Sequence, residues 1–235
     1  ANQDNVIYSL DLRSGVKNWE YQTNLTFLKS DFKNNFAIDE LNKNLFFLNT
    51  SGEFYSINYG NKNINWVLNF RNPSLAGDTD LFLSQPIVKK NDILIVSTEK
   101  AILGYEALSG NKKWDFPSNT LVKPVLTTNF TYIISKNNLL ICLENKVGNV
   151  LWSKNIYKSL TNKISQKIGK FHDFKIVNNE LSVYTKKGYV LTYNYKNGDF
   201  IKAKKISKNG INSEIVFLNE SIFLIDNKSK LLKLN

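Results

Sequence analysis

One strand–turn–strand unit recurs along the chain and constrains its fold more than any other feature. In the clearest copy, residues 101–114 (AILGYEALSGNKKW), a short apolar strand leads to a turn at Gly110 and a second strand that carries Trp114. Repetition of one supersecondary unit is the signature of a repeat architecture. Two other copies keep both residues, with Gly four residues before Trp: Gly15 and Trp19, and Gly148 and Trp152. Two further copies keep one of the two residues, Trp66 or Gly198.

Two weaker copies each lack one of these residues. Lys62 stands at the Gly position before Trp66, and Lys202 stands at the Trp position after Gly198. The four Trp positions are separated by 47, 48 and 38 residues. Periods of about 40–50 residues, each long enough for four short strands, favour the blades of a β-propeller over a helical solenoid.

Each full unit is predicted to contain four strands. In the third unit we expect them at residues 85–88, 93–97, 101–107 and 112–116, where short apolar runs are bounded by Asn, Asp, Lys and Gly. Gly at the third turn can adopt a positive φ, and a Trp in each unit is large enough to fill the gap between neighbouring sheets. The predicted fold class is therefore all-β, a β-propeller of four-stranded antiparallel blades.

The ends of the sequence suggest part of a larger ring. The chain begins at a third strand (residues 6–11) and stops after another third strand (residues 231–234). We expect residues 1–235 to form a single propeller domain of about five blades, with half-blades at both ends and the rest of the ring upstream. A five-bladed ring that closes irregularly is the alternative.

The net charge of +11 raises the question of a nucleic-acid partner. The excess is nearly all Lys, is distributed along the chain, and accompanies abundant Asn, Ile, Phe and Tyr, which share A/T-rich codons. No Arg cluster and no aromatic–basic motif occurs, so we expect no nucleic acid as partner. No run of 18 apolar residues occurs, so no transmembrane segment is predicted.

Two residues are candidates for chemistry and are interpreted as structural. Cys142, which is the one cysteine, lies at an inward-facing strand position and is expected to act as a small buried apolar residue. A nucleophilic role would need a nearby base, and the one histidine, His172, belongs to a different repeat.

The longest connection leaves two interpretations open. In residues 153–170, Ile156, Leu160, Ile164 and Ile168 recur every four residues with lysines between them. The spacing is compatible with a short basic amphipathic helix. The same residues could instead fasten an irregular loop over the blades.

The Gly-x-x-x-Trp units resemble the propeller repeat of the quinoprotein alcohol dehydrogenases, the PQQ repeat. Residues 9–19 (SLDLRSGVKNW) are the closest copy of that repeat. Within the superfamily the chain is most similar to the BamB family of outer-membrane assembly lipoproteins. Three features carry this similarity: the short unit before Trp152, the copy without Trp at Gly198, and the acidic linker that precedes Pro86.

The resemblance implies an eight-bladed ring, of which this chain would supply roughly the last five blades. It implies a lipid-anchored location at the periplasmic face of the outer membrane, with the anchor on a missing N-terminal segment. The implied partners are the periplasmic domain of a BamA-like barrel-inserting subunit and unfolded outer-membrane proteins. Carried over to this sequence, the partner-binding residues are Leu25, Phe27, Leu28, Lys29, Asp78 and Asp80.

These six residues also have two physical interpretations. A small apolar patch near charged groups is suited to a binding hot spot, in which the charges steer the encounter. Alternatively, Leu25, Phe27 and Leu28 pin their own loop to the surface.

Three functions are compatible with the repeat. The first is a non-catalytic scaffold that binds proteins. The second is a quinone-dependent dehydrogenase, which needs oxygen ligands for Ca²⁺, a catalytic Asp and an aromatic floor for the quinone. The resemblance implies that such enzymes have longer chains than this one and carry a vicinal disulfide. A chain with a single Cys cannot form that disulfide. We therefore expect no enzyme activity, no cofactor and no metal. The third is a propeller domain of another periplasmic or surface protein that binds or senses ligands.

Overall fold

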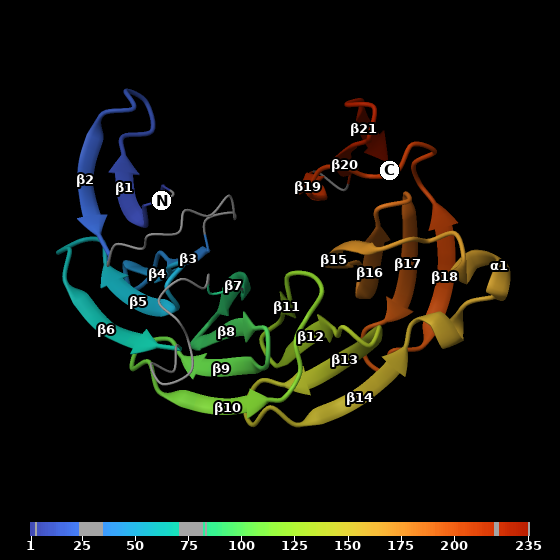
Figure 1. Ribbon diagram of the computed structural model, residues 1–235, viewed down its shortest axis with the longest axis horizontal. Helices are drawn as coiled ribbons and strands as arrows, with labels where there is room; N and C mark the ends of the chain where they lie inside the picture. Colours follow the sequence, from blue (N-terminus) through green and yellow to red (C-terminus); the bar gives the residue numbers. More distant parts are fainter. Residues whose placement is uncertain (3, 24–34, 71–81, 83, 219–220, 235) are drawn as a thin grey trace. The chain divides into compact units, whose positions relative to one another are not determined.

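The computed structural model describes residues 1–2, 4–23, 35–70, 82, 84–218 and 221–234. The chain divides into two compact units, Ala1–Phe116 (unit 1) and Pro117–Asn235 (unit 2). In the described residues almost all regular structure is antiparallel strand, and each strand pairs with its neighbour in sequence (Figure 1). The all-β, four-stranded antiparallel organisation predicted from the repeat is thus confirmed.

Unit 1 contains three of the described sheets. They are a two-stranded sheet (β1–β2) and two four-stranded sheets (β3–β6 and β7–β10). The strands are β1 (Val6–Leu10), β2 (Lys17–Gln22), β3 (Phe36–Asp39), β4 (Asn44–Leu48), β5 (Glu53–Asn58), β6 (Ile64–Asn69), β7 (Ser84–Lys90), β8 (Ile93–Thr98), β9 (Ile102–Glu106) and β10 (Lys112–Phe116).

Unit 2 contains two four-stranded sheets (β11–β14 and β15–β18) and a three-stranded sheet (β19–β21) in its described residues. The elements are β11 (Val125–Leu126), β12 (Phe130–Ile134), β13 (Leu139–Glu144), β14 (Val150–Asn155), the 3₁₀ turn η1 (Tyr157–Ser159), α1 (Asn162–Ser165), β15 (Phe171–Val177), β16 (Glu180–Thr185), β17 (Tyr189–Asn194), β18 (Phe200–Lys205), β19 (Val216–Leu218), β20 (Ser221–Ile225) and β21 (Leu231–Leu234).

Burial differs between the inner and outer strands of a sheet. Every residue of β4 (NLFFL) is buried, and so are the first five residues of β8. Such strands are apolar on both faces because side chains cover the sheet on both sides. The fourth strand β6 instead alternates between exposed and partly buried residues, and Trp66 takes a partly buried position. The outer strand is therefore amphipathic, and its Trp is directed toward the core.

The hairpin between the third and fourth strands has the same irregularity in five sheets. In each, the pairing register shifts by one residue just before the Trp position, which is the signature of a β-bulge. The residue directly opposite the Trp position is always small. It lies ten residues earlier in the chain: Ser9, Ser56, Gly104, Cys142 and Thr192.

The tryptophans also reach the next sheet. The Trp66 Nε1–H donates a hydrogen bond of 3.2 Å to the carbonyl oxygen of Ala107, in the turn after β9. A Cβ added to Gly110 would come within 2.8 Å of the Trp66 ring, and one added to Gly198 within 2.6 Å of the Trp152 ring. The turn glycine of one sheet thus makes room for the Trp of the preceding sheet.

The connection between β14 and β15 is a strap with two short helical turns. Ile156 and Ile168 are fully buried, Leu160 is buried, and Ile164 packs against the same core. The helical segments η1 and α1 comprise only three and four residues. Of the two interpretations left open by the sequence, the loop fastened by its apolar residues describes this segment, and a continuous amphipathic helix does not.

Candidate functional site

The six partner-binding residues predicted from the sequence lie in two segments, 24–34 and 71–81, outside the described residues. Their contacts are therefore not assigned, and they stay predictions: Leu25, Phe27, Leu28, Lys29, Asp78 and Asp80. The residues that flank both segments are described, and their contacts define where the two segments attach.

A hydrogen-bonded network joins the start of the first segment to the end of the second. The Thr23 hydroxyl donates to the carbonyl oxygen of Asn5 at 2.9 Å. The Asn5 side-chain amide donates to the Thr50 hydroxyl at 2.8 Å, and the Phe82 N–H donates to the Thr50 carbonyl oxygen at 2.9 Å. Thr23 and Phe82 are thus connected through two intermediate residues.

The other two flanks join the same region. Asn35, which follows the first segment, donates its side-chain amide to the Ser84 hydroxyl at 2.6 Å and accepts from the Ile87 N–H at 2.6 Å. Phe70, which precedes the second segment, stacks on Phe82 with ring centroids 5.9 Å apart and planes 25° apart. We call these flanking residues and the two that connect them the loop-root cluster: Asn5, Thr23, Asn35, Thr50, Phe70, Phe82 and Ser84.

No local pattern in the sequence marks this cluster directly. Asn and Thr are common at strand ends, so their pairing across 45 residues between Asn5 and Thr50 cannot be read from local patterns. Aromatic residues on both sides of the second segment, Phe70 and Phe82, were the one available hint, because two rings that flank a loop can close it by stacking.

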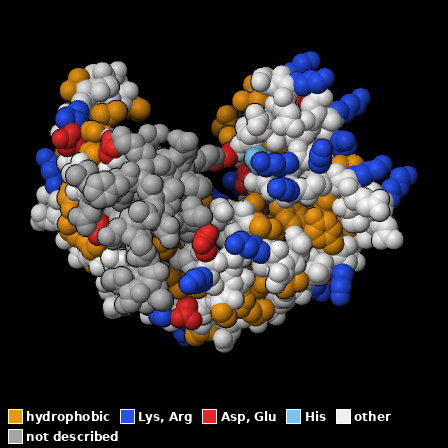
Figure 2. Space-filling model, in the orientation of Figure 1, with side chains coloured by type: hydrophobic (Ala, Val, Ile, Leu, Met, Phe, Trp, Pro, Cys, Tyr) orange, Lys and Arg blue, Asp and Glu red, His pale blue; other side chains and the backbone are white. Residues whose placement is uncertain are grey.

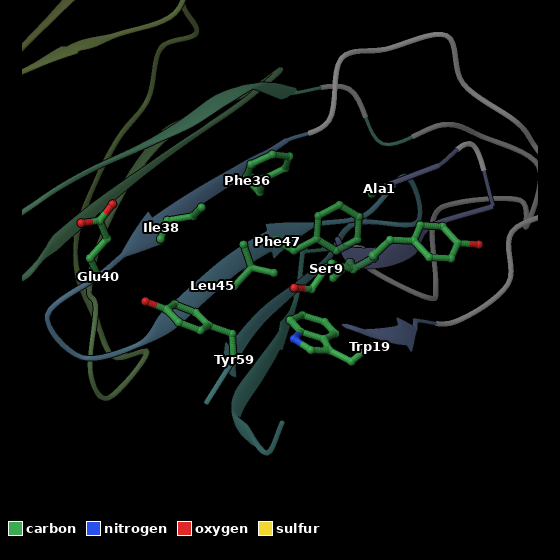
Figure 3. A pocket seen from close by; sticks show the side chains of 11 residues that line it. Ala1, Ser9, Trp19, Phe36, Ile38, Glu40, Leu45, Phe47 and Tyr59 are labelled. Atoms are coloured by element: carbon green, nitrogen blue, oxygen red, sulfur yellow. The ribbon is translucent and has the colours of Figure 1, made fainter. Parts of the chain in front are cut away.

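Unit 1 also contains an apolar groove with a volume of about 550 Å³. Its buried side chains are Ile7, Leu45 and Phe47, and its rim carries the exposed side chains of Phe36 and Ile38. Figure 3 shows Leu45 and Phe47 between these rim residues and the rings of Trp19 and Tyr59. Trp19 is therefore both a repeat residue and part of this groove.

The polar groups of the groove are few. Glu40 lies at one end, beyond Ile38 (Figure 3). Ala1 also lines the groove. One carboxylate among apolar and aromatic side chains can hold an apolar group with a nearby cation.

The two residues considered for chemistry have structural environments. Cys142 is buried opposite Trp152, and burial raises the pKa of its thiol to about 11. A thiol with so high a pKa is protonated near neutral pH and is a poor nucleophile. His172 places its Nε2 2.8 Å from the carbonyl oxygen of Ser213, which makes the ring a link between β15 and the segment before β19.

Two kinds of feature are absent from the described part of the chain. No cluster of three or more His, Cys, Asp or Glu side chains arranged to hold a metal ion occurs there. No helix in that part is long and apolar enough to cross a membrane.

Comparison with solved structures places the fold. BamB from Moraxella catarrhalis is similar over 99% of this chain and 64% of its own, with a TM-score of 0.68 and 13% identity. The designed protein Ika8 is similar over 84% of this chain and 56% of its own, with a TM-score of 0.62 and 9% identity. The designed protein Ika4 is similar over 65% of this chain and 91% of its own, with a TM-score of 0.51 and 9% identity.

At these identities the likeness shows the fold, a β-propeller of antiparallel blades, and the chain spans less than two thirds of the Moraxella BamB chain. No curated protein matches the sequence. The sequence model of the family described as outer membrane protein assembly factor BamB, a PQQ-repeat family, matches residues 1–154. Because this match covers well over half of the 235 residues, the chain belongs to the BamB family.

Proposed function

We propose that this chain is a non-catalytic scaffold of the outer-membrane β-barrel assembly machinery and binds the periplasmic domain of a BamA-like barrel-inserting subunit. The binding residues are those predicted in segments 24–34 and 71–81. One observation carries this proposal beyond family membership: all four flanks of the two segments meet in the loop-root cluster, so both segments emerge from one place in unit 1.

A shared root favours binding for a physical reason. Two loops that start from one rigid cluster present their side chains to the same partner surface, and the scaffold reduces the entropy lost when they bind. Leu25, Phe27 and Leu28 would supply apolar anchors, whereas Asp78 and Asp80 would supply negative charge for basic groups of the partner.

The proposal of a scaffold rather than an enzyme draws on the described sites. The groove offers Glu40 as its one side-chain carboxylate, and Cys142 is protonated inside the core. Neither site pairs a nucleophile with a base. Family membership supports the remaining elements of the proposal: a location at the periplasmic face of the outer membrane, anchoring through an N-terminal lipid, unfolded outer-membrane proteins as further partners, and a place for residues 1–235 within one larger propeller.

A double substitution tests the interface. Asp78→Lys with Leu28→Glu reverses one charge and places another in the apolar patch, so we expect capture of the immobilised BamA-like periplasmic domain to weaken at least tenfold, with an unchanged melting temperature. Surface plasmon resonance gives the affinity, and differential scanning calorimetry gives the stability.

The matched control is Asp92→Lys with Leu108→Glu. It repeats both kinds of substitution at exposed positions in the turns after β7 and β9, outside the loop-root cluster. The control should bind like the unmodified chain. Equal affinity of both double variants would remove these two segments from the interface.

A second candidate function is a PQQ-repeat propeller domain of another periplasmic or surface protein that binds or senses ligands. The apolar groove of unit 1 is the observation that favours it, because a concave apolar site with a few polar groups is the usual form of a ligand site. Failure of the unmodified chain to bind any barrel-inserting subunit would favour this candidate.

A further inference from the structure

The net positive charge of the chain lies in one unit. Residues 1–116 contain 12 Lys and Arg against 13 Asp and Glu, whereas residues 117–235 contain 19 Lys, no Arg, and 7 Asp and Glu. The lysine excess is therefore not spread evenly along the chain, contrary to the expectation from composition. A codon bias would act on both halves alike, so it does not explain this division.

Several loops of unit 2 meet at one end of its last two sheets. The Lys186 N–H donates to the Lys170 carbonyl oxygen at 2.8 Å, which joins the turn after β16 to the strap before β15. The Ile211 N–H donates to the Lys186 carbonyl oxygen at 3.1 Å, and the Ile206 N–H donates to the Gly188 carbonyl oxygen at 2.8 Å. These bonds add the segment after β18 to the same group of loops.

The turn after β20 joins this group through side chains. The Asn227 side-chain amide donates to the carbonyl oxygen of Asn209 at 2.7 Å. The Asn209 side-chain amide donates to the Asp226 carboxylate at 2.7 Å, and this hydrogen bond is the main cause of the lowered pKa of Asp226. Asp226 also accepts from the backbone N–H groups of Lys228 and Lys230, so its carboxylate is used to hold the turn.

The parts of these four loops that meet are the end of the strap (residues 166–170) and residues 186–188, 206–215 and 226–230. Seven exposed lysines project from them, and we call these the lysine face: Lys167, Lys170, Lys186, Lys187, Lys208, Lys228 and Lys230. Figure 2 shows Lys side chains gathered over the part of unit 2 that contains these loops. Within the described residues none of the seven forms an ion pair at salt-bridge distance.

Other lysines of the same unit do form ion pairs. Lys154 lies 2.8 Å from the Asp199 carboxylate, and Lys175 lies 3.4 Å from that of Asp173. Asp173 and Asp199 are therefore paired with lysines of the strands, and the seven lysines of the lysine face outnumber Glu214 and Asp226, the two acidic residues of the same loops. Charges of one sign gathered on one surface attract an oppositely charged partner over roughly a Debye length.

The composition of the four loops selects the class of partner. The parts that meet, residues 166–170, 186–188, 206–215 and 226–230, contain no Arg and no aromatic residue; Tyr157 lies earlier in the strap. Protein–protein interfaces are enriched in Arg and aromatic residues and depleted in Lys. Single-stranded nucleic acids are bound by stacking of their bases on aromatic rings. Lysine ammonium groups on several loops match instead the many negative headgroups of an anionic bilayer. Near such a surface each Lys strengthens binding about fivefold.

We propose that the lysine face docks on the surface of a bilayer that contains anionic phospholipid. The ammonium groups lie among the headgroup phosphates, and no side chain needs to enter the hydrocarbon. This contact is independent of the protein partner proposed above, because it uses unit 2 and rests on charge alone.

Vesicle flotation with the full chain tests the proposal. We expect the protein to float with vesicles of phosphatidylglycerol and phosphatidylcholine in about 0.1 M salt and to be released in about 1 M salt, where the Debye length falls to about 3 Å. Vesicles of phosphatidylcholine alone should not carry it. Lys186→Gln with Lys187→Gln should weaken binding to the anionic vesicles about 30-fold, because two lysines are lost.

The matched control is Lys146→Gln with Lys196→Gln. These exposed lysines lie in the turns after β13 and β17 of the same unit, and the double variant has the same net charge as the test variant. It should keep most of the binding. Circular dichroism melting checks that both variants are folded.

Three results would overturn the proposal. The first is no flotation with anionic vesicles in low salt. The second is equal loss of binding in both double variants, which would mean that overall charge rather than the lysine face is responsible. The third is tighter binding to duplex DNA than to vesicles at equal phosphate concentration, which would assign the face to nucleic acid.

Discussion

At the scale of single residues, a small residue lies opposite each Trp, and for Trp66 and Trp152 a turn glycine of the next sheet also leaves room for the ring. One lies opposite the Trp in its own sheet, such as Gly104, where an added Cβ would come closer than contact distance to the Trp114 ring. Another lies in the turn of the next sheet, as Gly110 does for Trp66. The turn conformation alone does not require Gly, because Lys62 adopts a φ of 67° at the equivalent position. Gly110 is required for space as well.

Two glycine substitutions separate these requirements. Gly110 and Gly15 have φ values of 74° and 69°, so Ala at either position carries a similar backbone strain of about 1–2 kcal/mol. An added Cβ at Gly15 meets nothing within 4 Å, whereas at Gly110 it meets the Trp66 ring at 2.8 Å. We expect Gly110→Ala to lower the free energy of unfolding by about 1–3 kcal/mol more than Gly15→Ala, measured by urea denaturation.

A double-mutant cycle adds a check on this prediction. With Trp66→Ala in the background, the extra cost at Gly110 should disappear because the ring that the Cβ meets is absent. Equal losses for the two glycine variants in the unmodified background would show that the Trp66 ring moves aside without cost.

The same packing around Trp explains the position of Cys142. It occupies the position opposite Trp152 that Ser9, Ser56 and Gly104 occupy in other sheets. This position therefore requires a small side chain. Cys142 is buried there, as expected for a small apolar residue. Its chemistry follows from the same burial, which raises the pKa of the thiol to about 11.

At the scale of elements, a buried ion pair connects two sheets of unit 1. The Asp39 carboxylate at the end of β3 lies 2.7 Å from the Lys89 ammonium on β7, and both side chains are largely buried. Burial alone would raise the pKa of Asp39, but hydrogen bonds from Asn42 and the Lys89 ammonium outweigh it and lower the pKa. The charged form of Asp39 is therefore favoured in the folded protein.

This pKa shift predicts a pH dependence of stability. Because the pKa of Asp39 is lower in the folded chain than in the unfolded chain, the stabilisation is present above about pH 4 and is lost as the pH falls through the folded value. Asp39→Asn leaves Lys89 without its charged partner and should cost about 3 kcal/mol at pH 7. The difference between the two proteins should shrink on acidification below about pH 4.

Urea denaturation of both proteins between pH 7 and about pH 3 measures this difference. Lys17→Gln serves as the control, since its ion pair with Glu20 is exposed on both sides and should contribute little at any pH. A constant difference between Asp39→Asn and the unmodified chain across this range would show that Asp39 is not stabilised in its charged form.

In the strap between β14 and β15, packing against the core determines the conformation more than the four-residue spacing of its apolar residues does. Its four-residue spacing suits a helix, yet Ile156, Leu160 and Ile168 are buried from a path that is helical only in short turns. Isolated short helices are marginal in water, so the apolar contacts with the core decide the conformation.

At the scale of the whole molecule, membership of a PQQ-repeat family keeps one enzymatic alternative open to test. We expect added pyrroloquinoline quinone with Ca²⁺ to leave the melting temperature unchanged, because a ligand stabilises a folded protein only if it binds the folded state. Thermal scanning with and without both ligands measures this. A rise that grows with quinone concentration would contradict the proposal of a non-catalytic scaffold.

The two units differ in charge although they share one repeat. Unit 1 contains the loop-root cluster and the apolar groove, and unit 2 contains the lysine face. The repeat fixes the strands, while loops and surface side chains vary without disturbing the core. Distinct surfaces for a protein partner and for a bilayer can therefore be carried by one repeated fold.

The sequence by itself determined the blades. Four short apolar strands per repeat, a turn residue and a Trp are local signals, because burial alternates along a strand and turns need particular backbone angles. These signals placed β7 to β10 within a few residues, led to the PQQ-repeat resemblance, and marked Cys142 as structural.

Only the tertiary structure decided which distant residues meet. Asn5 and Thr50, Asp39 and Lys89, and Trp66 and Gly110 are each separated by more than 40 residues, and no local pattern encodes their pairing. The concentration on four loops of unit 2 of lysines that form no ion pair with the described residues likewise depends on where the acidic residues lie in space. Strand patterns follow from the neighbours of each residue in the chain, whereas binding surfaces follow from how the loops between strands are brought together.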